Sequence, residues 1–227
     1  MIRILDILTR VPVVPVLVIE DVGQAAPLAR ALVAGGLDVL EVTLRTPAAL
    51  RVVEAMRVAV PDATIGAGTV TRVEDFRDAA AAGAQFAVTP GYAPALGEAA
   101  ARAGLALLPG VMTPSDILAA RAAGYEALKF FPAEPAGGAA MLRAFAGPFA
   151  EVKFCPTGGI TYELAPRYLQ LSNVVCVGGS WLAPRTLLEH GDWAAIEHLA
   201  REAVALPRPN LPGRNEAKGN PMARKAL

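Results

Sequence analysis

The chain has 227 residues, of which 54% are hydrophobic and 19% are charged, with 21 basic and 21 acidic side chains. This length and apolar content indicate one globular domain with a large core. The balanced charge excludes the strongly basic or acidic character of proteins that bind nucleic acid or a membrane surface, so a small molecule is the expected partner.

The first long apolar run, VPVVPVLVI at residues 11–19, contains two prolines. It is about half the roughly 20 residues that a membrane-spanning helix needs. It also lacks the basic leader and cleavage site of a signal peptide. We therefore expect a cytoplasmic protein with no membrane contact.

Short β-rich runs recur along the chain, separated by alanine-rich helical stretches. Eight such runs occupy residues 11–19, 39–44, 64–70, 86–91, 106–112, 127–133, 151–159 and 174–181. The repeat of about 20 to 26 residues is close to the minimum for a right-handed βα unit. Eight units predict an α/β fold with a single (β/α)8 TIM barrel; an open doubly wound sheet is the alternative.

Several of the helical stretches carry start signals. These are Asp21, Thr46-Pro47, the capping-box spacing of Thr71 and Glu74, and the segment 113–116 with Thr113 at its head. Beyond Leu206 the composition becomes rich in proline, asparagine and charge. We therefore assign residues 1–206 to the barrel and predict that residues 207–227 form a C-terminal tail, either flexible or an oligomer arm.

Catalytic side chains of such barrels come from the carboxyl ends of the strands and the loops that follow them. Few polar residues fall there in this sequence. They are Glu41, Arg45, Thr69, Lys129, Glu134, Thr157 and Ser180, together with the glycine pairs Gly158-Gly159 and Gly178-Gly179.

Lys129 lies in the stretch 127-ALKFFPAE-134, which otherwise has the pattern of a buried strand. Alternation puts Ala127, Lys129 and Phe131 on one face. Burial of an unpaired ammonium costs several kcal/mol, so an inward-facing site favours the neutral amine, which can attack a carbonyl and form a Schiff base. The alternative is a structural lysine paired with Glu41 or Glu134.

One acidic and one basic candidate lie near the end of the second predicted strand. Glu41 is placed to share the barrel interior with Lys129 and to shuttle protons, or to serve only as its counterion. Arg45 is a candidate for a bidentate contact with a substrate carboxylate, with a surface arginine as the alternative. Lys153, at the start of the seventh strand, is expected at the opposite rim.

The two glycine pairs follow the seventh and eighth predicted strands, where barrels often bind phosphate. Backbone without side chains lets several N–H groups converge on an anion. Together the pairs predict a phosphate monoester on the substrate, with ordinary tight turns as the alternative.

The sequence predicts no metal and no cofactor. His190 and His198 both lie near the last helix, so neither a histidine-based triad nor a multi-histidine site can form. Cys155 and Cys176 lie in apolar runs without CxxC spacing, which indicates buried free thiols.

Six motifs extend this interpretation. They are EVTLRT (41–46), GAGTV (66–70), TPG (89–91), KFFPAE (129–134), FCPTGGI (154–160) and VGGSWL (177–182). In this order and at these intervals, over about residues 5–206, they closely resemble the 2-keto-3-deoxy-6-phosphogluconate (KDPG) aldolases. That family often also cleaves 4-hydroxy-2-oxoglutarate (KHG).

The resemblance implies a role for each matching residue. Lys129 would be the Schiff-base lysine and Glu41 the general acid and base. Arg45 and Thr69 would bind the carboxylate and keto-acid end, with Pro90 lining that pocket and Phe131 beside it. The phosphate would be held by Gly158, Gly159, Gly179 and Ser180. A homotrimer is also implied, and the tail after Leu206 is longer than in typical members.

The resulting hypothesis is a metal-independent class I cleavage of the phosphorylated keto acid 2-dehydro-3-deoxy-6-phospho-D-gluconate to pyruvate and D-glyceraldehyde 3-phosphate. Three alternatives stay open: the sister aldolase for the galactonate isomer, a phosphate-binding epimerase or isomerase, and a catalytically silent phosphometabolite-binding barrel.

Overall fold

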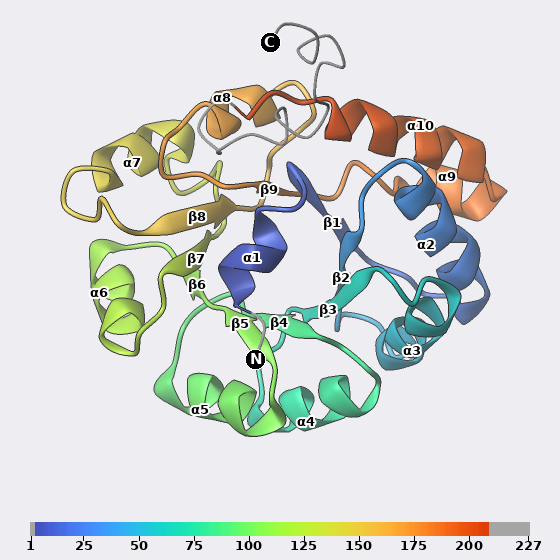
Figure 1. The fold of residues 1–227 in the computed structure, drawn as a ribbon, viewed down its shortest axis with the longest axis horizontal. Helices are drawn as coiled ribbons and strands as arrows, with labels where there is room; N and C mark the ends of the chain where they lie inside the picture. Colours follow the sequence, from blue (N-terminus) through green and yellow to red (C-terminus); the bar gives the residue numbers. More distant parts are fainter. Residues whose placement is uncertain (1–2, 209–227) are drawn as a thin grey trace, which may run out of the picture.

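Parallel strands close into a ring, and the helices other than α1 (Ile4–Leu8) lie around its outside (Figure 1). The computed structural model describes residues 3–208. The strands are β1 (Val13–Leu17), β2 (Val39–Thr43), β3 (Thr64–Gly68), β4 (Phe86–Val88), β5 (Ala106–Leu108), β6 (Gly110–Val111), β7 (Ala127–Phe130), β8 (Lys153–Pro156) and β9 (Val177–Gly179). The helices are α1 (Ile4–Leu8), η1 (Val22–Gln24), α2 (Ala25–Ala34), α3 (Ala49–Ala59), α4 (Val73–Ala81), α5 (Pro94–Ala103), α6 (Pro114–Ala122), α7 (Gly138–Phe145), α8 (Ala165–Leu169), α9 (Arg185–His190) and α10 (Trp193–Val204).

The ladder of hydrogen bonds shows how the ring closes. One sheet has the order β5-β4-β3-β2-β1-β9 and the other the order β6-β7-β8. β5 and β6 are two halves of one strand, separated only by Pro109, and a bridge between Thr157 and Gly178 joins the ends of β8 and β9. The nine segments therefore make eight strands, which confirms the predicted (β/α)8 barrel and rules out an open sheet.

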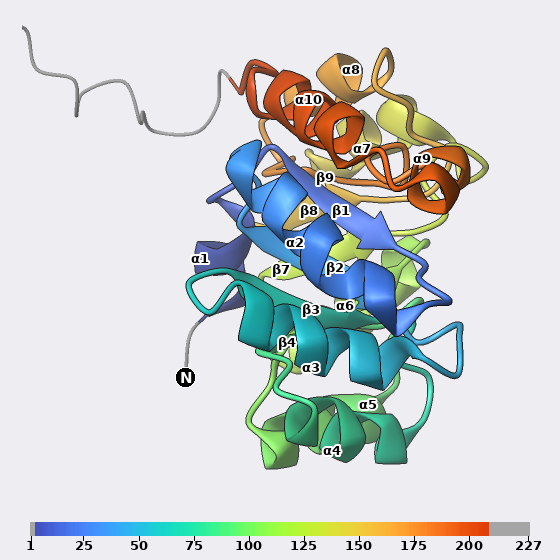
Figure 2. The same cartoon turned by 90° about the vertical axis from the view of Figure 1, so that its right-hand side faces the viewer.

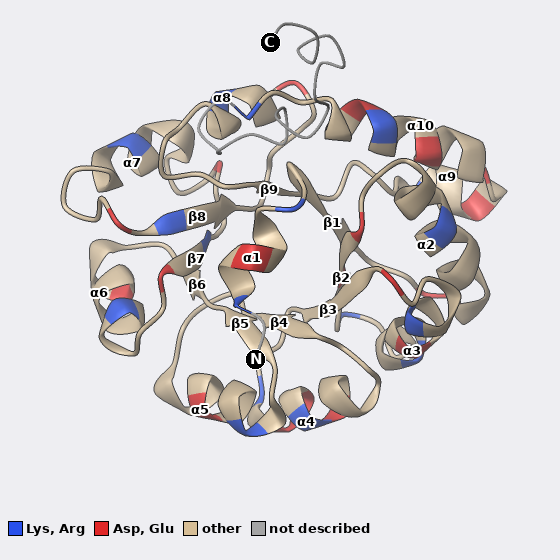
Figure 3. Ribbon diagram, viewed as in Figure 1, with Lys and Arg blue, Asp and Glu red and all other residues tan. Residues whose placement is uncertain are grey.

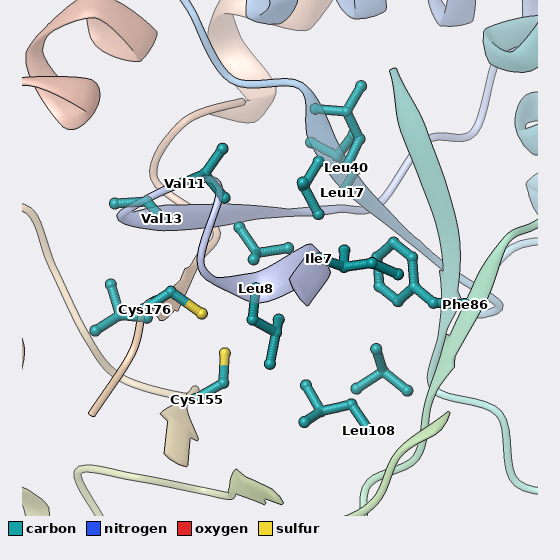
Figure 4. Packing of buried hydrophobic residues seen from close by; sticks show 14 of the residues in the cluster. Ile7, Leu8, Val11, Val13, Leu17, Leu40, Phe86, Leu108, Cys155 and Cys176 are labelled. Carbon is teal, nitrogen blue, oxygen red and sulfur yellow. The ribbon is translucent and has the colours of Figure 1, made fainter. Parts of the chain in front are cut away.

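Each of the eight predicted β-rich runs contains an observed strand. β1, β2 and β3 are buried along their whole length, because one face lines the barrel and the other packs under helices. Gly66 of β3 leaves room for the ring of Phe86, since a Cβ at that position would collide with it. The ring fills the barrel beside Ile7 (Figure 4).

Helix α1 has no counterpart in the elements predicted from the sequence. It lies across the amino ends of the strands, and its Ile7 and Leu8 side chains point into the barrel core (Figures 1 and 4). Arg3 forms an ion pair with Glu126, the residue before β7, with 2.7 Å between Nη2 and Oε2. Five residues are too few to show a helical period, and Arg3 offers no capping side chain, so the sequence carries no signal for this helix.

The capping box predicted at Thr71 and Glu74 is wrong by one residue. α4 begins at Val73, and the carboxylate of Asp75 accepts hydrogen bonds from the backbone N–H of Thr71 at 3.2 Å and of Arg72 at 3.1 Å. The shorter aspartate side chain reaches both donors, so the helix starts one residue later than the spacing predicts.

The other start signals have mixed outcomes. Thr113 caps α6, because its hydroxyl accepts a hydrogen bond from the Asp116 N–H at 3.2 Å. Asp21 caps the short η1 turn in front of α2. Thr46 does not cap α3; its hydroxyl donates instead to the Ile19 carbonyl at 2.6 Å.

Charge is distributed around the outside of the ring. In Figure 3 acidic and basic residues alternate on the outer helices, and neither sign forms a continuous patch in this view. α10 packs against α2 and completes the outer layer (Figure 2). No helix in the described part of the chain is long and apolar enough to cross a membrane. Apart from its first two residues, the predicted tail 207–227 lies outside the described residues, and the boundary at Leu206 stays a prediction.

Candidate active site

Two buried charged side chains face each other across the carboxyl half of the barrel. Lys129 comes from β7 and Glu41 from β2, and three strands separate β2 from β7 in either direction around the ring. Lys129 is 4% exposed and Glu41 3%. The distance from Lys129 Nζ to Glu41 Oε1 is 3.6 Å, so the interior-facing lysine predicted from the strand pattern is confirmed, and Glu41 rather than Glu134 is its partner.

The pair is an ion pair without a direct hydrogen bond. Removal of either charge from water costs several kcal/mol, which their mutual attraction offsets only partly. Glu41 Oε1 has no hydrogen-bond partner among the described residues. Most buried polar atoms in proteins have a hydrogen-bond partner, so an unpaired one needs an explanation. A ligand that donates a hydrogen bond to Glu41 Oε1 would provide the missing partner.

Two neighbours shape the space around this pair. Gly68, the last residue of β3, lies so close to Glu41 that a Cβ there would collide with the carboxylate. The Phe131 ring centroid lies 5.0 Å from Lys129 Nζ, within the range of a cation–π contact. Phe131 was predicted beside the pocket, whereas the function of Gly68 was not identified from the sequence.

The residues predicted to bind the keto-acid end lie on the rim above β2, β3 and β4. Arg45 Nε donates a hydrogen bond to Thr69 Oγ1 at 3.2 Å. Thr69 has φ of 57°, a left-handed conformation that costs a residue other than glycine roughly 1 kcal/mol or more. Pro90 follows β4 at the same end, with its carbonyl packed against Gly110 of β6.

The predicted phosphate site occupies the rim above β8 and β9. Gly158 and Gly159 have φ of 107° and 80°, conformations that strongly favour glycine. The Thr157–Gly178 bridge puts their turn beside Gly179 and Ser180. Both predicted glycine pairs therefore lie side by side at the carboxyl ends of neighbouring strands. Ser180 also lines a cavity of about 360 Å³ together with Glu20 and Arg185.

Other residues that the sequence analysis singled out lie away from the carboxyl end of the barrel. Lys153 begins β8 at the amino end, and its Nζ donates to the Ser172 carbonyl at 3.0 Å, so its expected place at the opposite rim is confirmed. Cys155 and Cys176 are buried and free, as predicted (Figure 4). Burial, and next the neighbouring Cys155 thiol, raise the pKa of Cys176 well above its usual value. Residues 3–208 contain no cluster of three or more histidine, cysteine or acidic side chains that would hold a metal ion.

Tyr168 of α8 was not identified by the sequence analysis. It is 1% exposed, and its hydroxyl donates a hydrogen bond to Glu134 Oε1. Burial, and next this hydrogen bond, raise its pKa above the usual range for tyrosine. An aromatic residue in a helix has the pattern of a core residue, so the sequence offers no signal for this contact.

A buried lysine that faces a buried carboxylate at the carboxyl end of a (β/α)8 barrel is the arrangement of a Schiff-base aldolase. Comparison with protein families matches residues 4–199 to the KDPG and KHG aldolases. The chain belongs to this family.

Individual relatives agree with this assignment. The chain is 52% identical over 200 residues to the 2-dehydro-3-deoxy-phosphogluconate aldolase of Pseudoalteromonas atlantica, a match that covers 88% of this chain and 93% of the relative. It is also similar to the KDPG aldolase of Legionella pneumophila with pyruvate captured as a covalent carbinolamine intermediate (TM-score 0.86, 45% identity, 88% and 98% covered). The aldolase of Zymomonas mobilis ZM4 with 3-phosphoglycerate is similar as well (TM-score 0.87, 47% identity, 93% and 100% covered).

Proposed function

We propose that this protein is a class I aldolase that cleaves 2-dehydro-3-deoxy-6-phospho-D-gluconate to pyruvate and D-glyceraldehyde 3-phosphate, and 4-hydroxy-2-oxoglutarate to pyruvate and glyoxylate. The observation that carries the proposal is the buried Lys129 amine, 3.6 Å from the Glu41 carboxylate in the barrel interior. The covalent carbinolamine of pyruvate in the Legionella pneumophila relative supports the same chemistry.

The reaction begins at the C2 ketone of the substrate. The neutral Lys129 amine attacks the carbonyl carbon, which forms a C–N bond and a carbinolamine hydroxyl. Glu41, as the acid, gives a proton to that hydroxyl, which leaves as water, and the nitrogen lone pair closes the C=N bond of a cationic iminium. The amine must be neutral at the moment of attack, and transfer of its proton to the Glu41 carboxylate, 3.6 Å away, gives both the neutral amine and the acid that the next step uses.

The iminium then draws electrons from the bond that breaks. Glu41, now a base, accepts the proton of the C4 hydroxyl, and the C3–C4 bond breaks as C4 becomes the aldehyde carbon of the departing fragment. The electron pair of that bond moves to C3 and neutralises the iminium as an enamine. Glu41 returns the proton to C3, and one water molecule hydrolyses the resulting iminium, which releases pyruvate and restores the amine.

Two groups of residues on the rim would hold the ends of the substrate. Arg45 and Thr69 would bind the C1 carboxylate, and the turns at Gly158-Gly159 and Gly179-Ser180 would bind the C6 phosphate through backbone N–H groups. Only β1 separates β2 from β9 in the sheet order, and β8 neighbours β7, which carries Lys129, so both proposed binding regions border the end of the barrel where Lys129 and Glu41 lie. The 3-phosphoglycerate in the Zymomonas mobilis relative supports a phosphorylated three-carbon fragment as a ligand.

Trapping with pyruvate and borohydride tests the proposal. We expect wild-type protein to gain one reduced pyruvate adduct, found by peptide mass on Lys129, and Lys129→Ala to lose both the adduct and cleavage of the two keto acids. Lys153→Ala is the matched control, since its amine lies at the amino end of the barrel. It should keep the adduct and full turnover.

The same experiment separates the alternatives. An epimerase or isomerase that moves protons without a covalent bond would turn over sugar phosphates yet trap no pyruvate, and a silent binding protein would do neither. Comparison of kcat/KM for the gluconate and galactonate isomers decides between the two sister aldolases. The homotrimer implied by the family and a cytoplasmic location remain predictions.

A further inference from the structure

Glu134 and Tyr168 form a contact that the proposed chemistry does not use. Glu134 follows β7 in the loop that begins with Phe131, and Tyr168 lies on α8, just after the Gly158-Gly159 turn. The Tyr168 hydroxyl, on a side chain that is almost completely buried, donates to Glu134 Oε1. The contact therefore joins the loop after the lysine strand to the helix after the predicted phosphate turn.

Backbone hydrogen bonds bring the same two loops together. Ala133 N donates to Thr157 O at 2.8 Å, and Glu134 N donates to Gly158 O at 3.0 Å. These bonds continue the pairing of β7 with β8 past the ends of both strands. The conformation of the glycine turn is thus fixed partly by the backbone at Glu134.

Glu134 is exposed, and its side chain passes close to two glycines. A Cβ on Gly159 would lie 2.8 Å from Glu134 Cβ, and a Cβ on Gly138, at the start of α7, would lie 3.3 Å from Glu134 Oε1 and 3.2 Å from the Tyr168 hydroxyl. Gly159 and Gly138 both have positive φ, so side chains are disfavoured there on two counts. The missing side chains of the two glycines leave room for the glutamate on this side, and the Tyr168 hydroxyl donates to its carboxylate.

We propose that Glu134 and Tyr168 are positioning residues that set the preference of this protein for phosphorylated over unphosphorylated keto acids. Tyr168 binds the Glu134 carboxylate and holds it away from the bound phosphate, while the Glu134 side chain packs against Gly159 and keeps the N–H groups of the turn convergent. The proposal rests on the proposed function, because it assigns the phosphate of the substrate to this turn.

Charge explains why the tyrosine hydroxyl matters. Without it, the Glu134 carboxylate loses its donor and is free to turn toward the glycine turn, where its negative charge would repel a phosphate. 4-Hydroxy-2-oxoglutarate ends in a C5 carboxylate, short of the position of a C6 phosphate, so we expect either effect to be much smaller on it. Tyr168→Phe should therefore raise KM for 2-dehydro-3-deoxy-6-phospho-D-gluconate by about tenfold and change kcat/KM for 4-hydroxy-2-oxoglutarate by less than about twofold.

A second substitution tests the charge directly. Glu134→Gln keeps a carbonyl acceptor for Tyr168 and removes the negative charge, so by itself it should alter KM little. In the Tyr168→Phe background it should recover most of the lost affinity, because the freed side chain no longer repels phosphate. The inhibition constant of inorganic phosphate should follow the same order across wild-type, Tyr168→Phe and the double variant.

Tyr162→Phe is the matched control, since Tyr162 lies between the Gly158-Gly159 turn and α8 and has an exposed side chain. It should leave the kinetic constants for both substrates unchanged. Thermal unfolding shows whether each variant folds. An equal fall of kcat/KM on both substrates, or no recovery in the double variant, overturns the proposal in favour of a purely structural hydrogen bond. If wild-type protein traps no pyruvate, the proposed function fails, and titration with inorganic phosphate still decides for or against the positioning residues.

Discussion

Lys129 and Glu41 are close enough to attract each other, yet neither satisfies the other with a hydrogen bond. Under the proposed function their partners would be the atoms of a substrate, which needs both a nucleophile and a group that gives and takes protons. Lys153 shows the contrast within the same chain. Its amine donates to a backbone carbonyl at the amino end and forms no ion pair with a carboxylate of residues 3–208. The two lysines therefore differ in their surroundings because they lie at opposite ends of the barrel.

Gly68 gives the sharpest test at this scale. In Gly68→Ala the new methyl group would occupy the place of the Glu41 carboxylate and push it away from Lys129. A displacement of about 1 Å in a catalytic group can cost roughly 100-fold, so we expect kcat on both keto acids to fall by about that factor. Steady-state kinetics on the purified variant measure it.

Gly147→Ala is the control for that substitution, because the nearest atom to its new Cβ would be 3.9 Å away. It should retain full activity. Retention of full activity by Gly68→Ala, with Glu41 in an unchanged position, would mean that the close approach of β3 to Glu41 has no catalytic role.

The sequence was informative about those site residues whose chemistry shows in a linear pattern. A lysine inside an apolar strand and glycine pairs after successive strands are visible without coordinates, and Lys129, Gly158 and Gly159 were found in that way. Gly68 and Tyr168 were missed because they contact residues distant in sequence, Glu41 and Glu134. Such contacts depend on how loops pack in three dimensions, which no local pattern records.

At the scale of elements, burial decides what can be predicted. A strand covered on both faces is mostly apolar, and all eight strands of the barrel were located on that basis. Helix starts depend on single side chains that compete for the same N–H groups, as Asp75 does with Glu74 at the start of α4. α1 is short and uncapped, so the interactions that hold it are tertiary and leave no mark in the local sequence.

The cap of α6 predicts a pH dependence of stability. Burial alone would raise the pKa of Asp116, but its hydrogen bonds with Met112 and Thr113 outweigh burial and hold the pKa below the ordinary value of 3.8. The folded state therefore binds this proton less readily than the unfolded chain. The stabilisation from the ionised cap is complete above about pH 4 to 5 and is lost as the pH falls through the lower, folded pKa.

Asp116→Asn isolates that charge, because the amide oxygen can still accept both backbone hydrogen bonds. We expect the variant to be less stable by about 0.5 to 1 kcal/mol near pH 6, with the difference from wild-type shrinking as the pH falls below about 4. Urea unfolding at several pH values measures the difference in free energy of unfolding between the variant and wild-type. Glu98→Gln, an exposed carboxylate on α5, should show little change at any pH, and a gap for Asp116→Asn that stays constant down to pH 2 would contradict the assignment.

At the scale of the whole molecule, the two ends of the barrel differ: the proposed active site lies at one end, and the other end is covered by α1. The Lys129–Glu41 pair and the residues proposed to bind substrate lie at the carboxyl ends of the strands, while α1 and the Arg3–Glu126 ion pair cover the amino ends. Loops at one end can therefore change in sequence without disturbing the core, and residues at the other end contribute stability without touching substrate.

Leu8→Ala tests this division. Leu8 is fully buried in the barrel core, so its truncation should lower the free energy of unfolding by about 2 to 5 kcal/mol, because the removed atoms leave a cavity that the strands cannot fill. Because α1 lies at the end opposite Lys129, kcat/KM of the folded fraction should change by less than about twofold. Leu118→Ala on α6, where the leucine is 57% exposed, controls for loss of a leucine as such and should lower stability by no more than about 0.5 kcal/mol. A Leu8→Ala variant that keeps wild-type stability yet loses activity would show instead that α1 acts on the catalytic pair through the barrel interior.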